Sequence, residues 1–161
     1  SLTLEEMAEH DAVIDVKLAA LGNPNIPTRV IHRMAAGTGK RVRETIAGNI
    51  STPKTILMKS ARDRDTNVAY NVACNPNVPR EALTILAERR NIGILVAVVR
   101  NKNTPEEALA KLARNNNRNL RLLIAEHENT SRETLEFLLL KAVKEADQKL
   151  AETVRLALAK Q

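Results

Sequence analysis

Prolines recur along this chain at a constant interval of 26 residues, and this interval restricts the fold more than any other feature of the sequence. The anchor positions are Pro27, Pro53, Pro79 and Pro105, followed by Ser131 where the next proline would stand. A tandem repeat of this length is typical of supersecondary units that stack on one another, each contacting only its neighbours.

The positions between the anchors hold the same class of residue in each unit. Counted from the anchor, offset +4 holds Ile31, Leu57, Leu83, Leu109 and Leu135, and offset +8 holds Ala35, Ala61, Ala87, Ala113 and Leu139. Offset +15 holds Val42, Val68, Ile94 and Leu120, and offset +19 holds Ile46, Val72, Val98 and Ile124. Apolar residues at +3, +4, +7 and +8 form one stripe of an amphipathic helix, which predicts a helix of about nine residues, helix A. The apolar pair at +15 and +19 predicts a second, short helix, helix B.

Two polar columns mark the ends of these helices. The column before the anchor holds Thr52, Thr104 and Thr130. We expect these threonines to be the N-caps of helix A, with the proline or Ser131 at the first helical position. The column four residues before the anchor holds Asn23, Asn49, Asn75, Asn101 and finally His127. Because asparagine tolerates a left-handed backbone, we expect it to end helix B.

A short helix pair cannot bury its apolar stripe alone, whereas stacked neighbours can. The sequence therefore predicts an all-α protein, a right-handed α-solenoid of about five helix–turn–helix repeats in a single domain, residues 1–161. The repeats are residues 23–48, 49–74, 75–100 and 101–126, with an N-terminal cap at 1–22 and a terminal repeat and cap at 127–161.

Both ends depart from the repeat. At the N-terminus, Thr3 and Glu6 match a capping box that opens a helix at Leu4. At the C-terminus, Val154 is the best match to Val42 but comes eight residues late. We expect one long helix A that runs to about residue 144, then a longer terminal helix B, with a polar outer face that keeps the solenoid soluble.

The repeat unit resembles the leucine-rich repeat variant family. Asn75–Ala87 carries Asn-Pro-Asn-x-Pro-x-Glu-x-Leu-x-x-Leu-Ala, Val42–Asn49 carries Val-Arg-x-x-x-Ala-x-Asn, and the resemblance extends over residues 16–139. It implies a right-handed superhelix in which α-helices alternate with shorter, sometimes 3₁₀, helices. One form of the family holds an iron–sulfur cluster on a cysteine-rich segment, and that function does not transfer to a chain with one cysteine. HEAT-like repeats, which are longer, are the second choice.

Composition narrows the class of protein. Hydrophobic residues make up 43% of the chain but aromatic residues only 1%, so the core must be aliphatic. The chain has no apolar run of about 18 residues, which predicts no membrane span. Its acidic N-terminal residues are unlike a signal peptide, and its single cysteine, Cys74, excludes an internal disulfide. A cytoplasmic protein is the default expectation.

No group of residues in the sequence predicts an active site. His10, His32 and His127 are far apart in the repeat frame, which argues against a metal site. We expect Cys74 to be a buried or half-exposed structural thiol. The segment Gly37-Thr38-Gly39 lacks the strand and the first glycine of a phosphate loop. We therefore expect no enzyme, no cofactor and no small-molecule substrate.

Charge is the one functional indication. The formal net charge is +6, and the excess lies in one structural column, offsets +9 to +16, which holds ten basic and three acidic residues. The basic residues of this column, here called the basic ridge, are Lys40, Arg41, Arg43, Arg62, Arg64, Arg89, Arg90, Arg114, Arg118 and Arg121. A ridge of this kind predicts a nucleic acid, DNA or RNA, or another anionic macromolecule as partner.

A protein partner is the alternative, and the sequence leaves the two open. The offsets +17 and +18 of helix B turn apolar in the C-terminal half of the chain, at Val96, Ala97, Leu122 and Leu123. Such a patch is typical of a protein-binding surface, unless these residues pack against the terminal cap. The near-absence of aromatic residues argues against binding single strands by stacking.

Overall fold

The structure is a computed structural model that describes the backbone of residues 4–35 and 39–161, with side chains from residue 13 onward in these ranges. This part of the chain contains eleven α-helices and no strand. In chain order they are α1 (Leu4–Gly22), α2 (Thr28–Ala35), α3 (Lys40–Gly48), α4 (Lys54–Ser60), α5 (Thr66–Cys74), α6 (Arg80–Leu86), α7 (Ile92–Arg100), α8 (Glu106–Leu112), α9 (Arg118–Glu126), α10 (Arg132–Lys144) and α11 (Gln148–Leu158). The predicted all-α class is confirmed.

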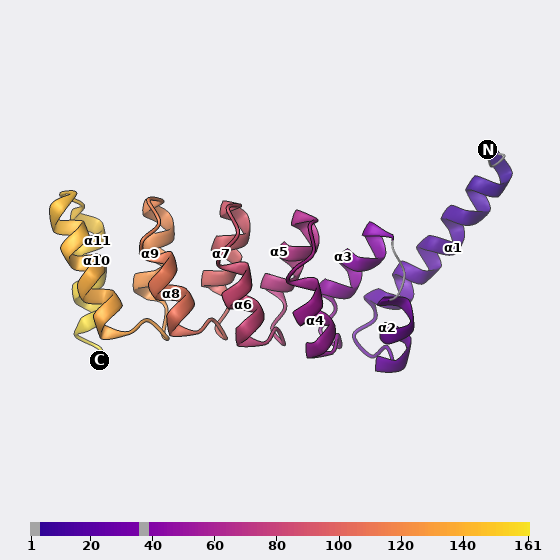
Figure 1. The fold of residues 1–161 in the computed structure, drawn as a ribbon, viewed down its shortest axis with the longest axis horizontal. Coiled ribbons are helices and arrows are strands. Elements are labelled where there is room, and N and C mark those ends of the chain that lie inside the picture. The colour runs from indigo at the N-terminus through magenta and orange to yellow at the C-terminus, as the bar shows by residue number, and fades with distance from the viewer. Residues whose placement is uncertain (1–3, 36–38) are drawn as a thin grey trace.

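The helix pairs stand side by side in chain order and form one long row (Figure 1). Helix A of each unit is α2, α4, α6, α8 or α10, and helix B is α3, α5, α7, α9 or α11. Successive B helices contact each other more extensively than successive A helices do. Helix α1 packs on α3 as the B helix of a preceding unit would. This arrangement is the predicted solenoid with helical caps, while its handedness stays a prediction.

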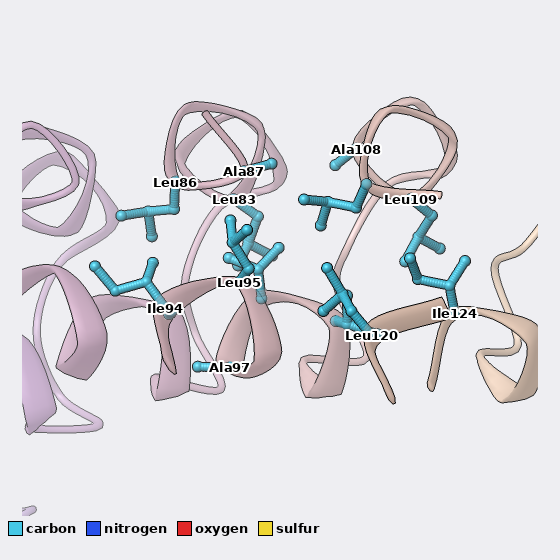
Figure 2. Packing of buried hydrophobic residues seen from close by; sticks show 14 of the residues in the cluster. Leu83, Leu86, Ala87, Ile94, Leu95, Ala97, Ala108, Leu109, Leu120 and Ile124 are labelled. Carbon is cyan, nitrogen blue, oxygen red and sulfur yellow. The ribbon is translucent and has the colours of Figure 1, made fainter. Parts of the chain in front are cut away.

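The core lies between the layer of A helices and the layer of B helices. Figure 2 shows Leu86 of α6 facing Ile94 of α7, and Leu109 of α8 facing Ile124 of α9. All four side chains are at most 2% exposed. Burying one such side chain contributes about 1.5–3 kcal/mol, so the predicted apolar columns supply most of the stability.

In the first four units helix B is longer than helix A, contrary to the prediction, whereas in the terminal unit α10 is longer than α11. Helices α4, α6 and α8 have seven residues each, whereas α3, α5, α7 and α9 have nine. The last linker residue caps three of these helices, because Asp65, Asn91 and Asn117 accept hydrogen bonds from backbone N–H groups in the first turn of α5, α7 and α9. Helix α3 has the same length but follows Gly39, which has no side-chain cap. These N-caps start helix B early.

The start of helix A also differs from the prediction. Pro53, Pro79 and Pro105 occupy the N-cap position, and the first helical residue follows them. The threonine hydroxyls therefore do not cap helix A. Two of them, Thr52 and Thr104, donate to the carbonyl oxygens of Ile46 and Val98 at 2.5 Å, and Thr130 does the same to Ile124. Each buried threonine thus ties the start of helix A to the preceding helix B.

The asparagine column ends helix B without a left-handed backbone. Its φ angles are −74° at Asn49, −70° at Asn75 and −80° at Asn101, so the predicted reason was wrong. The side chains carry the role instead. Asn75 donates to the carbonyl oxygens of Ala47 and Asn49 at 2.9 Å, and Asn101 donates to those of Ala73 and Asn75.

Asn49 and His127 complete this set of contacts. Asn49 donates to the carbonyl oxygens of Leu21 and Asn23, and Nε2 of His127 lies 3.1 Å from the carbonyl oxygen of Asn101. We call Asn49, Asn75, Asn101 and His127 the asparagine ladder. Each rung joins a unit to the unit before it through buried or partly buried hydrogen bonds.

The C-terminal cap follows the predicted helices but not the predicted surface. Helix α10 ends at Lys144, as predicted, and α11 begins after Asp147, which caps it. The outer face of α10 is not polar, however, because Phe137, Leu140 and Val143 are 40%, 71% and 62% exposed. These residues lie three apart, so they form one apolar stripe on the helix.

The N-terminal cap is a single helix, α1, rather than a short helix followed by half a repeat. Thr3 and the side chain of Glu6 lie outside the described residues. Val16, which corresponds to Val42, is 70% exposed, and among residues 13–22 of this helix only Leu21 is fully buried. Leu21 packs with Ile26, Ile31 and Ile46 in a small cluster separate from the main core. No described helix is both long enough and apolar enough to cross a membrane.

Candidate functional site

The basic ridge follows the turns between helices A and B and the first turns of the B helices. Two hydrogen bonds show that neighbouring turns touch: Arg89 donates to the carbonyl oxygens of Ala61 at 3.0 Å and Asp63 at 2.6 Å. Helices packed side by side lie about 10 Å apart, so the ridge presents one turn at each such step. Because its guanidinium holds the preceding turn in place, Arg89 has a structural role.

The N-terminal part of the ridge is paired within the chain. Lys40 Nζ lies 3.0 Å from Asp65 Oδ2, and Arg43 Nε lies 2.7 Å from Asp63 Oδ2. The hydrogen bond from Lys40 lowers the pKa of the Asp65 carboxyl below its usual value. Partial burial alone would raise the pKa of Asp63, but the hydrogen bonds from Arg43 and from a backbone N–H outweigh it and lower that pKa.

Arg41 pairs with a residue outside the ridge. Its Nη2 lies 3.1 Å from Asp15 Oδ1 on α1, and both side chains are mostly exposed. Exposed pairs of this kind contribute little stability. Asp15 precedes Arg41 by one repeat length, so an alignment of α1 with the B helices could have found this pair from the sequence.

The C-terminal part of the ridge is also paired. Arg118 donates to both carboxylate oxygens of Asp147, at 2.6 and 2.8 Å. Arg121 is only 3% exposed; it donates to Glu145 at 2.5 Å and to the carbonyl oxygen of Asn115 at 3.1 Å. Its buried Nε has no hydrogen-bond partner among the described atoms. The guanidinium of Arg121 therefore lies in the interior and not on a binding surface.

Four residues of the ridge remain exposed and make no hydrogen bond or ion pair within the described ranges. These residues, here called the open arginines, are Arg62, Arg64, Arg90 and Arg114. They occupy three successive turns, after α4, α6 and α8. Four carboxylates outside the +9 to +16 windows pair with other ridge residues: Asp15, Glu44, Glu145 and Asp147. Counting them reduces the formal charge of the +9 to +16 windows, which hold ten basic and three acidic residues, from +7 to +3.

The apolar patch predicted on the B helices is partly covered. Ala97 is buried, and Val96, Leu122 and Leu123 are half-buried against the main core. Tyr70, at the equivalent offset on α5, is 45% exposed. A hollow of about 340 Å³ lies between α5 and α7 beside Tyr70 and Val96.

The other candidate residues are spread over the molecule. His32 is exposed and His127 belongs to the asparagine ladder. Cys74 is exposed, so the expectation of a buried or half-exposed thiol was wrong. No three His, Cys, Asp or Glu residues come together as a metal site within residues 13–35 and 39–161. Gly37 and Thr38 lie outside the described residues.

Searches with protein-family models, among curated proteins and among solved structures find no match to this chain. The resemblance to the leucine-rich repeat variant family therefore stays a prediction.

Proposed function

We propose that this chain is a non-catalytic binding scaffold, a solenoid of leucine-rich repeat variant type, whose open arginines bind an extended anionic macromolecule. Nucleic acid is the partner that this chemistry fits best. The observation that carries the proposal is the exposure of Arg62, Arg64, Arg90 and Arg114 on successive turns, without partners in the described chain. The other six ridge residues make hydrogen bonds or ion pairs within the chain.

The spacing of the open arginines suits a phosphate backbone. Successive turns repeat at about 10 Å, the usual helix-packing distance. One strand of a DNA duplex carries a phosphate about every 3.4 Å, so each turn meets every third phosphate or so. Four guanidinium–phosphate contacts support weak, sequence-independent binding that falls steeply with salt.

The test is a salt titration with a labelled 20-base-pair DNA duplex and the same sequence as single-stranded RNA. The variant replaces all four open arginines by alanine. We expect this variant to bind more weakly, with the slope of log K against log salt reduced by roughly 3–4 for the duplex.

A matched control removes the same charge from elsewhere on the surface. Arg29, Lys54, Arg80 and Lys102 are exposed, lie outside the ridge and make no ion pair within the described chain. Replacing these four by alanine gives a protein of equal net charge. The proposal requires the control variant to keep most of the binding. Equal losses of affinity in the two variants would show that binding depends only on net charge. No binding by the parent protein would refute the proposal.

A further inference from the structure

The hollow between α5 and α7 is a second surface, separate from the basic ridge. None of the ten ridge residues lines it. Its walls include Tyr70 and Cys74 from α5 and Val96, Ala97 and Arg100 from α7. Helices α5 and α7 are neighbours in the row (Figure 1).

One residue of the lining is a glycine. This residue is Gly93, and the same offset in the neighbouring units holds Asn67 on α5 and Asn119 on α9. Both of these asparagines are exposed. The units on either side therefore carry a side chain at the position where this unit has none.

The walls of the hollow combine an apolar floor with one cation. Val96 and Ala97 supply aliphatic surface, and Arg100 is exposed and makes no hydrogen bond or ion pair with the described chain. The Tyr70 hydroxyl belongs to the same group of side chains. Its interaction with Cys74 raises the pKa of Tyr70 above its usual value, and the charge of Arg100 opposes this shift.

We propose that this hollow binds an acidic peptide segment of a partner protein. A large aliphatic side chain of the peptide packs on Val96 and Ala97, and a neighbouring carboxylate pairs with Arg100. Arginine suits this contact because its planar guanidinium binds a carboxylate through two hydrogen bonds. The floor is aliphatic and Tyr70 is its one aromatic residue, which favours a peptide over stacked bases.

A selection experiment identifies the peptide from random sequences. The probe is a phage-displayed library of random 12-residue peptides, panned on the parent protein after depletion on a Gly93→Asn variant. This variant gives position 93 the side chain that Asn67 and Asn119 carry at the same place. Its Cβ atom would lie 3.1 Å from Oδ1 of Asn91, the N-cap of α7, so the cap has to shift slightly to accept it. We expect the enriched peptides to share an acidic residue beside a large apolar residue.

Synthetic versions of the enriched peptides then test the contact by fluorescence polarisation. We expect Arg100→Glu to weaken binding at least tenfold and a peptide with lysine in place of its acidic residue to restore it. Bound peptide should also slow alkylation of Cys74, the only cysteine of the chain, which locates the peptide at the hollow. Circular dichroism and thermal unfolding establish that each variant is folded.

The outcomes separate this inference from the proposed function. Replacing the open arginines by alanine should leave peptide affinity unchanged within twofold. The inference is overturned if no peptide is enriched on the parent protein after depletion on the Gly93→Asn variant. It is also overturned if the peptide with lysine in place of its acidic residue fails to bind the Arg100→Glu variant. Binding of the single-stranded RNA probe that depends on Arg100 would also overturn it, in favour of a nucleic-acid surface that extends beyond the ridge.

Discussion

The side-chain amide of Asn75 donates a hydrogen bond to the carbonyl oxygen of Asn49, the residue that occupies the same place one repeat earlier. It donates a second bond to Ala47, and Asn75 itself is 1% exposed. Its Oδ1 atom accepts from the N–H of Asn77. One buried amide therefore connects two units and shapes the turn that follows helix B.

Replacing this asparagine should be costly. Asn75→Ala removes two buried hydrogen bonds and the bond from the N–H of Asn77, while the carbonyl oxygen of Asn49 still accepts from the N–H of Thr52. We expect a loss of about 2–4 kcal/mol in the free energy of unfolding, measured by urea denaturation. The control is Asn77→Ala, which removes one exposed bond to Ile50. A loss in the control as large as that of Asn75→Ala would contradict a special role for the ladder.

The last rung of the ladder can be improved. His127 reaches the carbonyl oxygen of Asn101 with Nε2 and accepts from the N–H of Asn129 with Nδ1. An asparagine keeps both contacts and adds a bond to Val99, the residue that corresponds to Ala47 for Asn75. We expect His127→Asn to stabilise the protein by about 0.5–1.5 kcal/mol, seen as a higher midpoint of thermal unfolding. A lower midpoint would show that the packing of the imidazole contributes more stability than the hydrogen bonds of the asparagine amide.

Helix α10 ends in a strained residue. Ala146 has φ 54°, and the N–H groups of Ala146 and Asp147 bond to Val143 and Ala142 in the pattern of a Schellman motif. Glycine adopts this φ without steric cost, so Ala146→Gly should stabilise the protein by up to about 1 kcal/mol. The control is Ala159→Gly, at a C-cap with φ −70°, which should be neutral or destabilising. Differential scanning calorimetry distinguishes the two, and equal effects would be evidence against relief of strain.

Acid should weaken the C-terminal cap. The hydrogen bond from Arg118 lowers the pKa of the Asp147 carboxyl below its usual 3.8. A carboxyl whose pKa is lower in the folded state stabilises the protein above its unfolded pKa, and this contribution disappears as the pH falls through the folded-state value. We expect Asp147→Asn to be less stable than the parent at about pH 7 and the difference to shrink steadily as the pH falls below the usual carboxyl pKa.

Urea midpoints measured across this pH range test that expectation. Asparagine can still cap α11, so the variant removes mainly the charge. The control is Glu152→Gln, because Glu152 is an exposed carboxylate on the same helix with no ion pair in the described chain. A stability difference for Asp147→Asn that does not change with pH would show that the pair with Arg118 contributes through packing alone.

The apolar columns could be predicted from the sequence because a solenoid buries the same positions in every repeat. Leu83 and Ile94 sit in the core at the places their offsets predicted. The capping residues were misread, since threonine and asparagine serve several local roles and the sequence does not show which carbonyl lies within reach. The ladder spans neighbouring units, so its partners become evident only once the units are stacked.

The sequence predicted where the basic ridge lies in each repeat, but not which of its side chains are exposed and free of partners in the described chain. Counting charge within each unit found the ten residues, yet six of them have partners, some contributed by other units. Asp147 was beyond sequence reasoning because the 26-residue period breaks before it. Arg121 shares its offset with Arg43, but the terminal cap buries it, and no local feature of the sequence indicates this difference.

The reach of the asparagine ladder has a consequence for how chains of this kind change in length. Every rung connects equivalent places in adjacent units, and no described rung extends further. If residues 75–100 were excised, Asn101 would arrive where Asn75 had been and would meet the same carbonyl oxygens, those of Ala47 and Asn49. Duplication or loss of one whole module should therefore leave its neighbours undisturbed, so a gene of this design can grow or shrink in steps of 26 codons.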